Sequence, residues 1–183
     1  MAEETPLWLS IEFLQNILRK AKNDNSIRVI DVFSKPATAK GDNYSSDMYR
    51  VSVEFSSKQE DREVMNKISF IVKVAPSIEQ SKVFDTEISI MENLLKKMND
   101  LVGPAHILGT QIFYSKKEYP SFLVIEDLVP LGFRMADRQA GLDLPHCLCA
   151  MQGLARFHAS NLAVCEKETL RLYTNGFLQV LIY

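Results

Sequence analysis

Two charged residues stand where the sequence otherwise predicts buried apolar side chains. Lys73 interrupts the apolar run 68–75, which is typical of a strand covered on both faces. Glu87 has the helical phase of Phe84 and Ile88 and therefore falls within an apolar stripe. A buried ammonium or carboxylate costs several kcal/mol unless it is paired, so an ion pair between Lys73 and Glu87 would satisfy both groups. The alternatives are a lysine whose ammonium reaches water and a glutamate at the edge of its stripe.

Other polar residues give weaker indications of chemistry. Arg134 and Arg138 could contact a phosphate or a substrate, but arginines in a polar loop are usually solvated. The cysteines lack the spacing of metal ligands, and reduced thiols in a helix are the simpler interpretation of Cys147, Cys149 and Cys165. The sequence therefore predicts no metal site in this chain.

The spacing of apolar residues predicts the elements that must position the charged pair. Ser10 can cap a first helix that ends at 23–25. Ser77 and Gln80 match a capping box, which predicts a helix of about twenty residues that Gly103 and the following proline stop. Alternating or continuous apolar runs predict five strands, at 27–33, 49–55, 68–75, 107–114 and 121–128.

Two segments read as connections, and a last helix follows them. Residues 56–66 form a polar, charged connection, and 129–143 form a looser stretch with proline and glycine. Helical spacing returns at 144–164. Its apolar face consists of Leu148, Met151, Ala155, His158 and Leu162. On such a face, His158 is predicted to be a hydrogen-bonded imidazole in the core.

This order of elements defines an α+β fold. Five mostly antiparallel strands with a long helix between the third and the fourth form one lobe, and the last helix begins a second, helical lobe. The linker is the best candidate for the boundary. The sequence thus predicts a sheet lobe at 1–128, a hinge and linker at 129–143, and the start of a helical lobe at 144–183.

A series of short motifs runs in a fixed order through most of the chain and resembles a known family. Together the motifs are similar to the ecdysteroid kinase-like proteins of insects, in the choline kinase and aminoglycoside phosphotransferase branch of the protein-kinase-like fold. The resemblance implies a kinase-like N-terminal lobe and the beginning of a helical C-terminal lobe. The motifs are Gly41-Asp42-Asn43-Tyr44-Ser45-Ser46, Tyr49-Arg50-Val51, Phe70-Ile71-Val72-Lys73, Phe84 with Glu87, Leu123–Leu128, Gly132-Phe133-Arg134, Arg138–Asp143 and Leu154–Ala159.

The resemblance implies that the charged pair binds ATP. Lys73 would hold the α- and β-phosphates, with Glu87 as its partner on the helix, as phosphoryl transfer in kinases requires. Nucleotide is thus the expected ligand. The full-length relatives would transfer the γ-phosphate to a hydroxyl of a small molecule, with an ecdysteroid as one candidate acceptor.

The resemblance also implies two backbone segments around the nucleotide. Gly41, Asn43 and Ser45 would belong to the loop over the phosphates, although its single glycine makes it a weak pattern and an ordinary hairpin turn is the alternative. The backbone from Glu126 to Leu128 would face the adenine. Alone, that segment is more simply a terminal strand whose acidic pair meets water.

The parts that perform chemistry in the family have no counterpart in this sequence. A catalytic loop needs a His-x-Asp motif with a later Asn, and a further Asp holds Mg²⁺. None of the three histidines begins such a motif, and no aspartate follows Asp143. We therefore expect a truncated, inactive ATP-binding portion with no catalytic residues, and Mg²⁺ only in a full-length relative. The alternative is a noncatalytic interaction module that self-associates through the apolar residues 176–183.

Charge and hydropathy exclude other classes of protein. Lys and Arg total 21 against 23 Asp and Glu, so the net charge of -2 gives no basic field to attract nucleic acid or anionic lipid. No apolar run is long enough to cross a bilayer, so no membrane partner is expected. The acidic start MAEETPLWLS has no secretory or transit signal, which predicts a cytoplasmic protein.

Overall fold

The computed structural model describes residues 6, 8–38, 46–60, 62–137 and 139–168. The chain divides into two compact units, each of them discontinuous in sequence. The first unit comprises residues 1–84 and 111–131, and the second comprises 85–110 and 132–183. The division into domains at 1–128, 129–143 and 144–183 stays a prediction.

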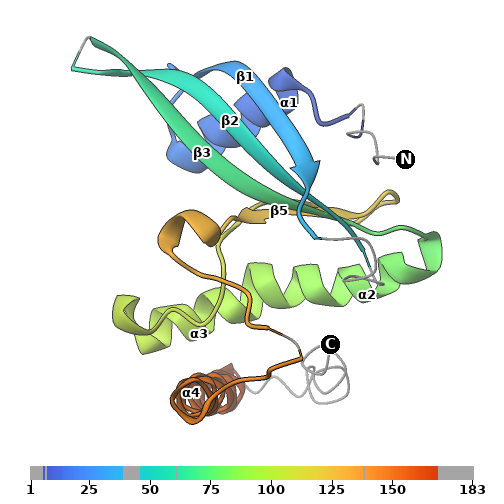
Figure 1. Ribbon diagram of the computed structural model, residues 1–183, viewed down its shortest axis with the longest axis vertical. Coiled ribbons are helices and arrows are strands. Elements are labelled where there is room, and N and C mark those ends of the chain that lie inside the picture. Colours follow the sequence, from blue (N-terminus) through green and yellow to red (C-terminus); the bar gives the residue numbers. More distant parts are fainter. Residues whose placement is uncertain (1–5, 7, 39–45, 61, 138, 169–183) are drawn as a thin grey trace. The chain divides into compact units, whose positions relative to one another are not determined.

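The first unit is built on a five-stranded antiparallel sheet (Figure 1). Its strand order is β1-β2-β3-β5-β4, so the last two strands of the sequence exchange places in space. The predicted five-stranded antiparallel α+β lobe is thereby confirmed. The strands are β1 (Arg28–Pro36), β2 (Asp47–Gln59), β3 (Arg62–Val74), β4 (Ile112–Lys116) and β5 (Phe122–Glu126).

Helix α1 (Ile11–Lys22) covers one face of this sheet (Figure 1). It begins where predicted because the Ser10 hydroxyl accepts a hydrogen bond from the Phe13 amide at 3.2 Å. It ends at Asn23, which adopts the left-handed conformation (φ 51°) that asparagine tolerates better than most residues. The helix buries Leu14, Ile17 and Leu18 against alternate strand residues such as Val51, Val53, Phe70, Val72, Phe122 and Val124.

The side chains between these core positions point to the opposite face of the sheet. Register partners share a face, and β3 pairs Lys73 with Leu123 of β5 and Ile71 with Ile125. On its other side, β3 pairs Lys73 with Met48 of β2. Lys73 therefore stands on the sheet face that α1 does not cover.

The predicted polar connection at 56–66 is wrong. Strand β2 continues to Gln59 and β3 starts at Arg62, so the two form one long hairpin. Its outer half is polar because polar pairs bridge the two strands: Asn66 donates to the Ser57 hydroxyl at 3.1 Å, and Lys67 pairs with Glu54 at 3.0 Å. Cross-strand polar pairs replace the apolar alternation that would have signalled a strand.

The long helix that follows β3 has three parts. Helix α2 (Ile78–Ser89) continues through a π-helical turn, η1 (Ile90–Leu94), into α3 (Leu95–Val102). The wider turn closes with a hydrogen bond from the Leu95 amide to the Ile90 carbonyl. The predicted helix and its stop are thus confirmed, with the stop at Gly103 (φ 77°). The boundary between the two units falls within α2, between residues 84 and 85.

Only half of the predicted capping box forms at the start of α2. The Gln80 amide donates to the Ser77 hydroxyl at 3.3 Å, as in a capping box. The return bond from the glutamine side chain is missing, since the buried Oε1 atom of Gln80 has no hydrogen-bond partner among the described residues.

The predicted strand at 107–114 is shorter than expected. A 3₁₀ turn, η2 (Pro104–His106), precedes it, and β4 begins only at Ile112. A second 3₁₀ turn, η3 (Val129–Leu131), follows β5 at the start of the predicted linker.

Helix α4 (Leu144–Glu168) is the last described element and lies in the second unit. A small core joins it to α3, with Leu94, Met98 and Val164 buried and Phe157 packed against them. The predicted buried stripe of α4 is wrong, because Leu148, Met151, Ala155, His158 and Leu162 are all exposed. Among the described residues, no helix combines the length and the hydropathy needed to cross a bilayer.

Candidate functional site

Lys73 lies against the middle of helix α2. The residues before and after it in β3 are apolar, and the Lys73 side chain itself is half-buried. The Nζ atom lies 5.2 Å from the centroid of the Phe84 ring, which is buried. A cation over an aromatic face is attracted by the quadrupole of the ring. The apolar strand and the helix together thus fix the position of one ammonium group on the sheet face opposite α1.

Glu87 lies on α2, three residues after Phe84. Residues three apart on a helix are neighbours on its surface, so Glu87 and the ring that contacts Lys73 share one side of the helix. The Glu87 side chain is half-buried, in agreement with its predicted phase. Lys73 belongs to the first unit and Glu87 to the second, and their ion pair stays a prediction.

The predicted phosphate loop joins β1 to β2, and Gly41, Asn43 and Ser45 lie outside the described residues. The strand ends on either side of the loop are described. The Ala37 amide donates to the Met48 carbonyl at 2.8 Å, which closes the β1–β2 ladder. Because Met48 is also the register partner of Lys73, the chain re-enters the sheet on the strand next to the ammonium, after it has left the sheet from β1, one strand further away.

The segment predicted to face adenine begins at the last residue of β5, and backbone hydrogen bonds hold it in position. The Glu126 amide donates to the Gln111 carbonyl at 2.9 Å, and the Leu131 amide donates to the Leu128 carbonyl at 3.1 Å. Glu126 is the register partner of Phe70 and so shares the sheet face that packs on α1. The next residue, Asp127, alternates to the face that carries Lys73.

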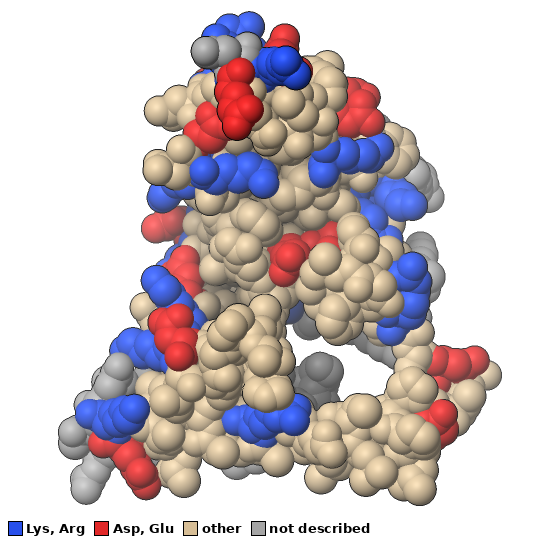
Figure 2. Space-filling model, turned by 90° about the vertical axis from the view of Figure 1, so that its left-hand side faces the viewer, with Lys and Arg blue, Asp and Glu red and all other residues tan. Residues whose placement is uncertain are grey.

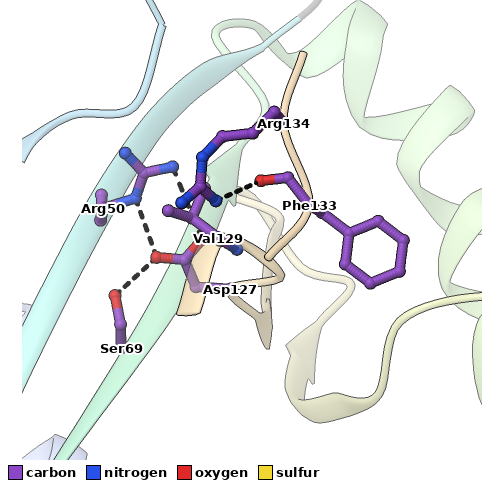
Figure 3. A network of polar contacts seen from close by, with 6 residues as sticks. All are labelled: Arg50, Ser69, Asp127, Val129, Phe133 and Arg134. Carbon is purple, nitrogen blue, oxygen red and sulfur yellow. Dashed lines mark hydrogen bonds and ion pairs between the residues drawn. The ribbon is translucent and has the colours of Figure 1, made fainter. Parts of the chain in front are cut away.

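Asp127 is the centre of a polar network that the sequence analysis missed (Figure 3). Its Oδ2 atom accepts hydrogen bonds from Arg50 Nε of β2 at 2.8 Å and from Ser69 Oγ of β3 at 2.7 Å. Its Oδ1 atom accepts from the Val129 amide at 3.2 Å. The carboxylate therefore joins two strands to the chain that leaves the sheet after β5.

This network corrects the alternative in which both acidic residues of the segment meet water. The Asp127 side chain is only 3% exposed, and that of Arg50 is 27% exposed. Burial by itself raises the pKa of Asp127, but hydrogen bonds from Ser69, Val129 and Arg50, with the charge of Arg50, outweigh it and lower the pKa. Asp127 is thus an ionised, buried carboxylate at neutral pH.

Little in the sequence could have revealed this network. Arg50 and Asp127 are 77 residues apart, and their contact depends on the register of three strands. The one available signal is Arg50 itself, a long cationic side chain within an otherwise regular strand pattern.

Of the two linker arginines that could contact a phosphate, the structure describes only Arg134. Arg134 donates to the carbonyl of its neighbour Phe133 at 2.7 Å and is exposed, and Arg138 lies outside the described residues. On the face drawn in Figure 2, Lys and Arg side chains are interspersed with Asp and Glu.

The second unit has a groove of its own, of about 500 Å³, between the η2 region and α4. His106, Arg156 and Phe157 are among the residues that line it, and no residue of the predicted nucleotide site does so. Within the described part of the chain, no three His, Cys, Asp or Glu side chains are grouped so that they could hold a metal ion.

The fold and the site together define a kinase-like N-terminal lobe, in which an antiparallel sheet carries a lysine against a long helix. Residues 40–181 match the Ecdysteroid kinase-like family, and the chain belongs to that family. The family indicates a kinase-like phosphotransferase acting on small molecules. No curated protein matches the chain, and no solved structure does.

Proposed function

We propose that this chain is the ATP-binding portion of a small-molecule kinase of the ecdysteroid kinase-like family. The observation that carries the proposal is the ammonium of Lys73, held at 5.2 Å from the Phe84 ring centroid on the sheet face opposite α1. A half-buried ammonium beside apolar side chains is a good partner for a phosphate group. In this proposal it binds the α- and β-phosphates, and Glu87 orients it from the next turn of α2.

Two further features support the same assignment. The strand that follows the predicted phosphate loop, with Gly41, Asn43 and Ser45, pairs Met48 with Lys73 in the register. In this proposal the loop covers the same phosphates. The segment from Glu126 to Leu128 leaves the sheet from the neighbouring strand β5 and offers backbone groups to the adenine.

The 183-residue chain alone is proposed to bind ATP without transferring its phosphate. Its sequence lacks a His-x-Asp motif and any aspartate after Asp143. Among the described residues, no three His, Cys, Asp or Glu side chains are grouped so that they could hold Mg²⁺, and the proposal for this chain includes no magnesium-dependent step. The hydroxyl acceptor, with an ecdysteroid as one candidate, would be bound by the parts that complete the site in full-length relatives.

Titration with a fluorescent ATP analogue tests ATP binding. We expect Lys73→Ala to weaken binding at least tenfold, since a charge-assisted contact to phosphate is lost. Lys67→Met is the matched control, because Lys67 lies six residues earlier on the same strand and the same face but pairs with Glu54 in solvent. Equal affinity of the Lys73 variant and the wild type would refute the site.

The predicted partner Glu87 is tested in the same titration. Glu87→Gln should weaken binding less than Lys73→Ala does, because the phosphate contact itself is kept. Asp85→Asn, two residues away and exposed, serves as its control. Transfer of phosphate from ATP to any small hydroxyl compound by the purified chain, abolished by Lys73→Ala, would overturn the proposed inactivity.

One observation favours the alternative of a noncatalytic interaction module. Helix α4 exposes apolar side chains along about five turns, including Leu144 (71% exposed), Met151 (62%) and Leu162 (61%). Such a stripe marks a surface that another chain can cover, and a second copy of this chain is the proposed occupant. Residues 176–183, which the sequence predicts to self-associate, lie outside the described residues.

Light scattering on the eluting protein tests self-association. A dimer that becomes a monomer in Met151→Gln would support the interaction module. A monomer at high protein concentration would refute it and leave the nucleotide proposal unaffected.

A further inference from the structure

We infer that Asp127 is a positioning residue of the nucleotide site, which sets the backbone that meets the adenine. The inference rests on the proposed function, because it assigns a task within that site. It concerns the base of the nucleotide rather than its phosphates, and it follows from the hydrogen bonds by which the Asp127 carboxylate joins β2 and β3 to the chain that leaves the sheet.

The Oδ2 atom of Asp127 is bound to the sheet. It accepts from Arg50 Nε at 2.8 Å and from Ser69 Oγ at 2.7 Å, and these residues lie on β2 and β3. Both donors stand on the sheet face that carries Lys73, since they alternate with the core residues of their strands. The carboxylate is therefore fixed in position by β2 and β3, the two strands that carry Met48 and its register partner Lys73.

The Oδ1 atom of Asp127 is bound to the chain that leaves the sheet. It accepts from the Val129 amide at 3.2 Å, an arrangement typical of an Asx turn, and also from Arg50 Nη2 at the longer distance of 3.5 Å. Two backbone bonds flank it, from the Glu126 amide to Gln111 and from the Leu131 amide to Leu128. The segment that would face the adenine is thus held before, at and after Asp127, so its backbone is preorganised for a ligand.

Burial makes this arrangement stiffer than an ordinary surface ion pair. The Asp127 side chain is 3% exposed, whereas Glu54 and Lys67, which pair between the same two strands, are 48% and 65% exposed. A buried carboxylate that loses its partners is strongly destabilised, so the segment cannot shift freely away from Arg50 and Ser69. The exposed pair has no such constraint and gives a matched comparison.

The substitution Asp127→Asn tests this role with little change in the size of the side chain. Asparagine keeps an oxygen that can accept from the Val129 amide, but it places an amide group opposite the donors Arg50 and Ser69. Competition against a fluorescent ATP analogue then gives the affinities of three probes: ATP, adenosine and inorganic tripolyphosphate. The same set is measured for Lys73→Ala, for Ser69→Ala and for the control Lys67→Met.

A positioning role predicts a selective loss. Asp127→Asn should weaken ATP and adenosine by about tenfold, roughly the value of one well-placed hydrogen bond, and leave tripolyphosphate within twofold of the wild type. Ser69→Ala should have a smaller effect of the same kind. Lys73→Ala should weaken ATP and tripolyphosphate and spare adenosine. A merely structural role of Asp127 would weaken all three probes alike, and that result would overturn the inference.

Hydrogen exchange of the unliganded protein provides a second readout. The amides of residues 127–129 and of Leu131 should exchange faster in Asp127→Asn than in the wild type, while those of α1 keep their protection. Unchanged exchange in the segment would overturn the inference whether or not nucleotide binds. A wild-type chain that binds none of the three probes would instead refute the proposed function, and the task assigned to Asp127 with it.

Discussion

Replacement of Arg50 by methionine should destabilise the first unit far more than its single charge suggests. The substitution keeps most of the apolar stem but removes the guanidinium that contacts Asp127 Oδ2 at 2.8 Å. The carboxylate, 3% exposed, then remains ionised in the interior with hydrogen bonds only from Ser69 and Val129. Loss of one partner of a fully buried pair costs about 3–5 kcal/mol.

The expected cost for Arg50→Met is smaller than that range. The Arg50 side chain is 27% exposed, so water reaches the vacated position and solvates part of the carboxylate. Two of the hydrogen bonds to Asp127 also survive. We therefore expect a fall of about 2 kcal/mol in the free energy of unfolding at pH 7. Lys67→Met, which breaks the exposed pair with Glu54, should cost at most about 0.5 kcal/mol.

The pH dependence of the same variant follows from the lowered pKa of Asp127. A carboxyl whose pKa is lower in the folded than in the unfolded state stabilises the fold fully above its unfolded pKa, near 3.9. That contribution is lost as the pH falls through the folded pKa, because the protonated group no longer pairs with Arg50. The difference in stability between wild type and Arg50→Met should thus shrink below about pH 4.

Urea unfolding followed by tryptophan fluorescence measures this difference. Trp8 is the single tryptophan and stacks on Phe122 with the ring centroids 4.1 Å apart, so its emission reports on the first unit. Equal losses of stability in Arg50→Met and Lys67→Met at pH 7 would show that the buried network contributes no more than the exposed pair. A difference that grows as the pH falls below 4 would contradict the assigned ionisation of Asp127.

Two further predictions concern the core of the first unit. Phe122→Ala should lower the free energy of unfolding by about 3–4 kcal/mol and shift the emission of Trp8 to the red, because it leaves a cavity beneath the indole; unchanged emission would exclude the stacking. Ser10→Ala should cost about 1 kcal/mol by removing the cap that accepts the Phe13 amide, and a Ser10→Asp variant that restores stability at pH 7 is the control, since aspartate caps equally well.

The sequence predicted the elements well where their signals are local. Helix α1 starts after Ser10 and ends before Asn23, because each boundary depends on one side chain and its nearest backbone groups. The stop of the long helix at Gly103 was equally local. The π-helical turn within it was not predicted, since a single wider turn leaves the apolar pattern almost unchanged.

Features that depend on pairing between strands were harder to predict. The hairpin of β2 and β3 extends through residues 56–66, where cross-strand pairs such as Lys67 with Glu54 replace apolar alternation. Lys73 could be singled out because a charge stands out in an apolar run. Asp127 could not, since its partners become neighbours only once the register is set.

The exposed face of α4 shows a different limit. Helical periodicity identified which residues share that face, but not what covers it. Periodicity records that side chains such as Leu148 and Met151 are grouped, and burial requires a partner surface that periodicity does not contain.

The strand order also affects how this protein must be made in the cell. Strand β3 lies between β2 and β5, yet about fifty residues separate its end from β5 in the sequence. While the ribosome synthesises the intervening helix, residues 70–74 of β3 therefore form an unpaired, largely apolar strand edge that is exposed to solvent. Such an edge invites pairing with other nascent chains, so efficient folding in the cell should depend on chaperones that shield it until β5 emerges.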